Sequence, residues 1–210
     1  LYDILRQHSD IYIPSFKEPH FFDIPDNFKN GLEWYKETYY RNAESKIIAD
    51  FTPTYFFDQY APKRIFQSLG KDIKFLVILR NPVDRAYSHY LMDHSLGLMS
   101  ESFESIIRKK SKNRKAHFFY QQYVEVSKYT EQIKRYLQVF EKENIYIAKY
   151  ICNEIGKIYN SNKFDYRKLI KFVNKFSIKN FAFGLSSCLA TCVFCHSFKF
   201  EYDDFNFKSI

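Results

Sequence analysis

The segment ILRNPVDRAYSHY places two arginines and a serine directly after an apolar run. Arg80 ends that run, and Arg85 and Ser88 lie three positions apart, on one face of the helix that the following residues predict. A guanidinium fork matches the oxygens of a phosphate group, and ligands of open α/β sheets bind beyond the carboxyl ends of the strands. The spacing therefore indicates an anion site. The alternative is that Arg80 pairs with a carboxylate such as Asp50 or Asp84, and that the serine is an ordinary helix residue.

The same segment predicts a sharp junction between strand and helix. Asn81 can cap the helix, Pro82 fits its first position, and Asp84 is favourable beside the free amides of the first turn. We therefore expect the strand to end at Arg80 and the helix to begin at once. Helix N-termini favour anions, which supports a phosphate at this junction.

Two segments of the chain resemble sulfotransferases that use 3′-phosphoadenosine 5′-phosphosulfate (PAPS). RNPVDRAYSHY is similar to their 3′-phosphate-binding segment, in which an arginine at a strand end is followed eight residues later by a serine; Arg80 and Ser88 match these positions. KEPHFFD, which begins at Lys17, resembles the Lys-Glu segment of the heparan-sulfate branch. FTPTYFF, ESFES and YTEQIKRYLQVF follow in the order that this branch would place them. Two ordered motifs are more specific than either alone.

The resemblance implies a role for each polar residue of these segments. Glu18 is the base that takes a proton from the acceptor, and His20 beside it is a second catalytic residue. Lys17, Asp23 and Arg85 are assigned to the substrate, while the matched arginine and serine hold the 3′-phosphate of the carrier. The implied co-substrate is PAPS, the implied acceptor is a carbohydrate, and no metal is expected.

The residues of KEPHFFD could also have purely structural roles instead of catalytic ones. Glu18 could be a solvated loop acid paired with Lys17, in a turn that Pro19 favours. His20 could bind a backbone carbonyl under the edge of the core. Asp23 could cap the helix that follows it.

The chain departs from the family pattern in several places. The loop KxGTT, which cradles the 5′-phosphosulfate in these enzymes, is not in this chain, so we expect weak carrier binding and poor turnover or none. The opening residues, LYDILRQHSD, predict the last turns of a helix and hence an N-terminally incomplete fold. Phe51 stands where several relatives have a lysine before TPSY, and the resemblance fades after Tyr150.

Strand-like and helical patterns alternate along the chain and must position these residues. Strands are predicted at IYI from Ile11, KIIAD from Lys46, KFLVIL from Lys74 and IYIAKYI from Ile145. Helices are predicted over 28–40, 59–69, 82–95, 101–110 and 118–143. The alternation predicts an α/β fold with a parallel sheet flanked by helices. The resemblance implies the sulfotransferase version of the P-loop nucleoside-triphosphate-hydrolase fold, although no glycine-rich phosphate loop is visible.

The composition predicts one globular domain. The chain has 210 residues, of which 46% are apolar and 20% aromatic, and this excludes a disordered protein. We assign residues 1–150 to the sulfotransferase-like α/β domain, and 151–210 to a divergent C-terminal part of it or a poorly defined tail. The net charge of +8 is compatible with several anionic partners. The run RKKSKNRK, residues 108–115, could bind an anionic glycan or nucleic acid, although such runs are usually solvated.

The cysteines of CLATCVFCH match two further motifs by spacing. Cys188, Cys192 and Cys195 have the C-x-x-x-C-x-x-C spacing of radical iron–sulfur enzymes, and the C-x-x-C-H ending at His196 is that of c-type haem attachment. Too few residues follow to enclose a cluster, and haem attachment requires export, for which no signal is visible. We expect neither group, because cysteines are also ordinary small buried residues.

The combined prediction is a PAPS-dependent sulfotransferase that acts on a hydroxyl or amine of a glycan. The alternatives are a non-catalytic relative that binds 3′-phosphoadenosine nucleotides or polyanions, and a nucleic-acid-binding protein, which we do not expect. No segment predicts a membrane span. We expect a cytoplasmic protein, or a membrane-anchored or luminal one if a segment precedes Leu1.

Overall fold

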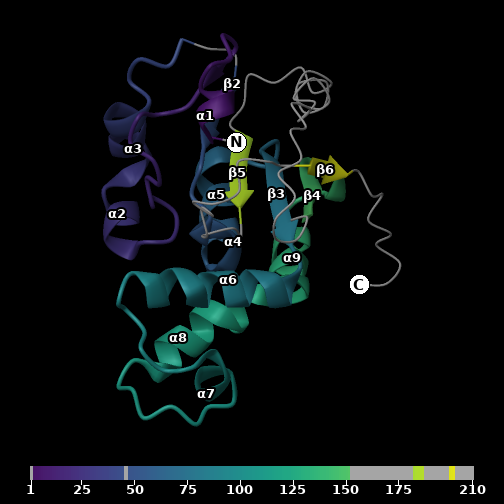
Figure 1. Cartoon of the computed structure of the whole chain (residues 1–210). Helices are drawn as coiled ribbons and strands as arrows, with labels where there is room; N and C mark the ends of the chain where they lie inside the picture. Colours follow the sequence, from purple (N-terminus) through teal and green to yellow (C-terminus); the bar gives the residue numbers. More distant parts are fainter. Residues whose placement is uncertain (1, 45–46, 152–181, 187–198, 202–210) are drawn as a thin grey trace.

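The computed structural model describes residues 2–44, 47–151, 182–186 and 199–201. These residues form a six-stranded sheet in the order β1-β2-β5-β3-β4-β6, in which only β6 runs antiparallel to its neighbour (Figure 1). The strands are β1 (Ile11–Tyr12), β2 (Ile47–Asp50), β3 (Lys74–Arg80), β4 (Ile145–Ile151), β5 (Ala182–Ser186) and β6 (Lys199–Glu201). The four predicted strands are confirmed as β1 to β4, and the predicted parallel sheet is confirmed with them.

The C-terminal part of the chain contributes β5 and β6, where the sequence predicts no strand. β5 pairs with β2 on one side and β3 on the other, so a segment distant in sequence completes the middle of the sheet. β6 pairs with the edge of β4. Cys188, Cys192 and Cys195 lie outside the described residues, as do most residues of 151–210.

The helices follow the predicted ranges in part. They are α1 (Tyr2–Leu5), α2 (Pro25–Lys29), α3 (Gly31–Tyr39), α4 (Thr54–Phe57), α5 (Ala61–Leu69), α6 (Pro82–Ser95), α7 (Phe103–Ile107), α8 (Ala116–Tyr123) and α9 (Tyr129–Leu137), with 3-10 turns η1 (Glu125–Ser127) and η2 (Lys142–Asn144). The predicted helix 28–40 is two helices, because Gly31 has a φ of 85° and interrupts the helical backbone. None of the described helices is both long and apolar enough to cross a membrane.

Apolar side chains alternate between the two faces of the sheet. Phe75, Val77 and Leu79 of β3 belong to the largest core cluster, together with side chains of α5 and α9. Ala49 of β2 belongs to a second cluster with Leu5 of α1. The alternation with a period of two is the one that a strand imposes, and helices accordingly flank both faces.

The predicted junction between β3 and α6 is confirmed. The Asn81 side chain accepts hydrogen bonds from the backbone amides of Val83, at 2.9 Å, and Asp84, at 3.3 Å. Pro82 occupies the first helical position. The strand therefore ends at Arg80 and the helix begins immediately, as the capping residues predict.

The predicted helix over 118–143 is wrong, because the chain turns between α8 and α9. In a continuous helix the Tyr123 carbonyl would accept a hydrogen bond from the backbone amide of Ser127. Here that carbonyl accepts hydrogen bonds from Arg85 Nη2, at 2.9 Å, and from the Ser127 hydroxyl, at 2.9 Å. The Ser127 amide instead donates to the carbonyl of Val124. The Arg85 side chain of α6 thus bonds to carbonyls at the end of α8, where the helix is interrupted.

Arg85, which the resemblance assigns to the substrate, lies in the interior of the fold. Its side chain is 1% exposed and bonds to the carbonyls of Gln122 and Tyr123 and, at 2.6 Å, to the hydroxyl of Ser127. The helix face that carries Arg85 packs against α8 and η1, so the guanidinium serves the fold. Ser88 is half-buried on the same helix.

The basic run lies in the connection between α7 and α8. Most of its side chains are exposed. Arg108 pairs with Glu104 at 2.8 Å, and the Lys109 ammonium lies 4.4 Å from the centre of the Tyr120 ring. These are local contacts of a solvated surface loop.

We predict that Arg85→Met lowers the free energy of unfolding by about 3 kcal/mol, because three acceptors lose a charged donor in the interior. Urea denaturation followed by circular dichroism measures this change. Arg108→Met is the matched control; it breaks an exposed ion pair and should cost about 0.5 kcal/mol or less. Equal effects of the two substitutions would contradict the structural role of Arg85.

Candidate active site

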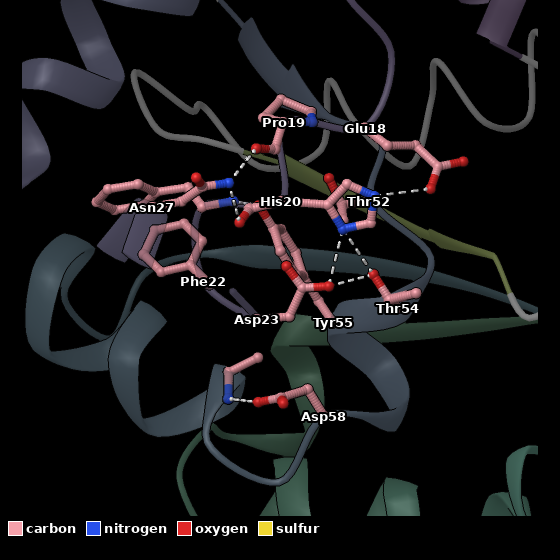
Figure 2. A network of polar contacts seen from close by, with 12 residues as sticks. Glu18, Pro19, His20, Phe22, Asp23, Asn27, Thr52, Thr54, Tyr55 and Asp58 are labelled. Atoms are coloured by element: carbon pink, nitrogen blue, oxygen red, sulfur yellow. Dashed lines mark hydrogen bonds and ion pairs between the residues drawn. The ribbon is translucent and has the colours of Figure 1, made fainter. Parts of the chain in front are cut away.

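The segment after β1 carries a compact group of ionisable side chains centred on His20 (Figure 2). Nδ1 of His20 lies 2.9 Å from Asp23 Oδ2, and Nε2 lies 3.4 Å from Glu18 Oε2. The Lys17 ammonium is 3.7 Å from the other oxygen of Glu18. The imidazole therefore bridges two carboxylates, one of which also has a lysine beside it.

Thr54 brings the beginning of α4 to the same group. Its hydroxyl donates a short hydrogen bond to Asp23 Oδ2 and lies 3.2 Å from His20 Nδ1. Thr54 follows the carboxyl end of β2, just as the histidine segment follows that of β1, and the two strands are parallel neighbours. Adjacent strand ends thus bring together residues that are 34 positions apart.

The two carboxylates raise the pKa of His20 from 6.5 to about 10. The hydrogen bond to Asp23 contributes most and the bond to Glu18 next, while partial burial acts in the opposite direction. His20 is therefore an imidazolium at neutral pH and cannot accept a proton. The Glu18 carboxylate can accept one, and its side chain is 22% exposed, so it is accessible to a substrate group.

The alternative roles of Asp23 as a helix cap and of His20 as a donor to a backbone carbonyl differ from the contacts in the structure. α2 is capped by Ile24 without a side-chain hydrogen bond, so Asp23 does not cap that helix. The His20 ring binds side chains of Glu18, Asp23 and Thr54. Oδ1 of Asp23 is buried and has no hydrogen-bond partner among the described residues, which leaves an acceptor in the group unused.

The backbone of this segment is strained at two positions. Glu18 has a φ of 64° and His20 a φ of 52°, a left-handed conformation that costs a non-glycine residue about 1 kcal/mol or more. The Asn27 amide of α2 donates to the carbonyls of His20, at 3.0 Å, and Pro19, at 3.4 Å (Figure 2). Interactions around the segment therefore maintain the conformation that brings Glu18 and His20 together.

The second predicted group, Arg80 and Ser88, lies at the carboxyl end of β3 and on α6. Nε of Arg80 is buried without a hydrogen-bond partner among the described residues, which is the kind of unused donor that an anion would satisfy. The amides of Val83 and Asp84 are already bonded to Asn81, so the guanidinium rather than these amides is the available donor. No hydrogen bond or ion pair within the described part of the chain joins this group to Glu18.

The suggested pairing of Arg80 with Asp50 is not observed. Asp50 is fully buried and accepts hydrogen bonds from the hydroxyls of Tyr35, Thr52 and Tyr55. The ring of Phe51 is buried against Tyr2 of α1, with ring centres 5.7 Å apart.

Sequence reasoning missed Thr54, Asn27 and Tyr55 as parts of this site. Thr54 and Tyr55 belong to the motif FTPTYFF, whose place in the chain was the only signal for them. Asn27 had no signal, because an asparagine near a helix start is an ordinary turn or cap residue.

Residues 1–151 match the sulfotransferase domain family. The chain belongs to this family. Heparan sulfate glucosamine 3-O-sulfotransferase 3A1 of Mus musculus is 40% identical over 106 residues, which are 50% of this chain and 26% of that protein. Heparan sulfate glucosamine 3-O-sulfotransferase 5 of Mus musculus is 25% identical over 163 residues, covering 70% of this chain and 43% of that protein.

A solved structure supports the fold of this sulfotransferase family member. The sulfotransferase from Alicyclobacillus acidocaldarius matches with a TM-score of 0.56 and 28% identity, covering 69% of this chain and 65% of that one. The predicted family, its heparan-sulfate branch and the α/β sulfotransferase fold are confirmed. The chain spans about a quarter to two thirds of the length of these relatives.

We predict that the stability difference between the wild type and His20→Gln depends on pH. The folded chain holds the His20 proton with a pKa of about 10, against 6.5 for the ordinary side chain, so the stabilisation is complete below pH 6.5. It is lost as pH rises through about 10. Thermal unfolding at several pH values measures the difference, with His117→Gln, at an exposed histidine, as control. A pH-independent difference would contradict the charged state of His20.

Proposed function

We propose that the protein transfers a sulfuryl group from PAPS to a hydroxyl or amine of a glycan. The observation that carries the proposal is the Glu18 carboxylate, held beside a protonated His20 and Lys17 at the end of β1. The family membership supports sulfuryl transfer, and the names of the heparan sulfate relatives support a glycan acceptor.

Glu18 would act as the general base. As the acceptor oxygen or nitrogen forms its bond to sulfur, its proton passes to the Glu18 carboxylate, and the bond between sulfur and the phosphate oxygen of the donor breaks. His20 already carries a proton on both ring nitrogens at neutral pH and cannot take this one, but its contact with the carboxylate orients Glu18. The unused oxygen of Asp23 could accept a hydrogen bond from the acceptor group.

Arg80 and Ser88 would hold the donor by its 3′-phosphate. The buried and unpartnered Nε of Arg80 fits this role, since a phosphate oxygen would satisfy it with a charge-assisted hydrogen bond. Ser88 is half-buried on α6 and provides a hydroxyl. The transfer is then a matter of placing donor and acceptor in line, with little covalent chemistry by the protein.

We predict that the chain binds the product nucleotide 3′-phosphoadenosine 5′-phosphate more tightly than adenosine 5′-phosphate. Arg80→Ala should weaken this binding about 10- to 100-fold, because a charged hydrogen-bond donor is lost. Isothermal titration calorimetry measures both, with Arg108→Ala, at an exposed arginine, as the matched control. Equal affinity for the two nucleotides would argue against the assigned 3′-phosphate site.

We predict that Glu18→Gln lowers kcat about 100- to 10,000-fold while nucleotide binding is retained, as expected for the loss of a general base. Transfer of radiolabelled sulfate from PAPS to heparan sulfate measures the rate. Glu33→Gln, at an exposed acid paired with Lys36, should leave it unchanged. Where the wild type transfers sulfate, undiminished transfer by Glu18→Gln would contradict the role of Glu18 as the base.

A further inference from the structure

The carboxylate of Asp50 lies in the interior beside the proposed site and is surrounded by hydroxyl groups. It ends β2 and is 0% exposed. Tyr35 and Thr52 donate hydrogen bonds to it at 2.6 Å, and Tyr55 donates one at 3.1 Å. Burial raises the pKa of Asp50 to about 6, and the three hydroxyls partly offset this effect, so the group is largely ionised at neutral pH.

The Tyr55 hydroxyl connects this carboxylate to the segment that carries His20. Tyr55 Oη accepts a hydrogen bond from the backbone amide of Phe21 at 2.9 Å and donates one to Asp50 Oδ2. An ionised carboxylate accepts hydrogen bonds only, so it turns the hydroxyl hydrogen of Tyr55 toward itself. The lone pairs of Tyr55 Oη are then available to the Phe21 amide. The charge of Asp50 thus determines the direction of this bond.

The Phe21 amide belongs to the peptide group that directly follows His20. Asn27 binds the carbonyl of that same peptide group and the carbonyl of Pro19, which belongs to the preceding one. Side chains of α2 and α4 therefore hold both peptide groups that flank the strained α-carbon of His20. The Tyr55 backbone is also fixed, because its carbonyl accepts a hydrogen bond from the hydroxyl of Tyr136 at 2.9 Å.

We propose that Tyr55, oriented by Asp50, is a positioning residue that holds His20, and through it Glu18, in the geometry of the active site. The role of Glu18 in this inference rests on the proposed function, whereas the placement of His20 does not. A phenylalanine at position 55 would fill the same buried space, so the hydroxyl is needed for its hydrogen bonds rather than for packing of the ring.

The test is the titration of His20 in Tyr55→Phe, followed by NMR of histidine-labelled protein without substrate. Once the Phe21 amide is released, the ring is no longer held at bonding distance from Asp23 and Glu18. We expect the pKa of His20 to fall from about 10 by roughly one pH unit or more in a variant that still unfolds cooperatively. Asp50→Asn should change it in the same direction, because an amide can donate to Tyr55 and reverse the bond. It also serves as the test if Tyr55→Phe does not fold.

Tyr40→Phe is the matched control, since it removes a buried tyrosine hydroxyl from the same cluster, 3.1 Å from that of Tyr35. It should leave the titration of His20 unchanged. The proposal is overturned if His20 titrates as in the wild type in folded Tyr55→Phe and Asp50→Asn. An equal change in Tyr40→Phe overturns it as well, because general loosening of the core would then be the cause.

A second readout separates this inference from the proposed function. Where sulfuryl transfer is measurable, Tyr55→Phe should lower kcat about tenfold and leave KM for the donor within about twofold, because the proposed donor site is at the end of β3 (Lys74–Arg80). A loss confined to KM would contradict positioning of the base. If the wild type shows no transfer, the titration of His20 still decides whether Tyr55 positions the segment.

Discussion

Parallel strands place their carboxyl ends along one edge of a sheet, and the candidate site depends on this constraint. The segment after β1 carries Glu18 and His20, the end of β2 carries Asp50, and β3 ends at Arg80. α6 begins at the same edge (Figure 1). Side chains from distant parts of the sequence become neighbours because the strands that precede them are aligned.

The high tyrosine and phenylalanine content of the chain has a second use beside burial of apolar surface. The core around α3 and α4 is built from rings, for example Phe21 stacked on Tyr35 with centres 4.4 Å apart. Tyrosines in that core also bring hydroxyls to groups that water cannot reach, such as the carboxylate of Asp50. The aromatic core therefore stabilises both the sheet and the strained segment beside it.

The two arginines of RNPVDRAYSHY have different surroundings although they are five positions apart. Arg80 is the last residue of a strand, and its Nε lacks a hydrogen-bond partner among the described residues. Arg85 is one turn into a helix that packs against α8, so its guanidinium binds the carbonyls at the end of that helix. Residue type and spacing predicted a ligand-binding role for both arginines. Only the packing of α6 shows that their surroundings differ.

The sequence by itself determined the features that depend on neighbours along the chain. The alternation of apolar residues predicted β1 to β4, and Asn81 with Pro82 predicted the start of α6, because a capping side chain bonds to amides two and three positions away. Tertiary structure alone decided the break after α8, the place of β5 between β2 and β3, and the contacts of His20 with Thr54 and of Phe21 with Tyr55. These features depend on hydrogen bonds between residues far apart in the chain, and the partners meet only when the sheet has brought the ends of its strands together.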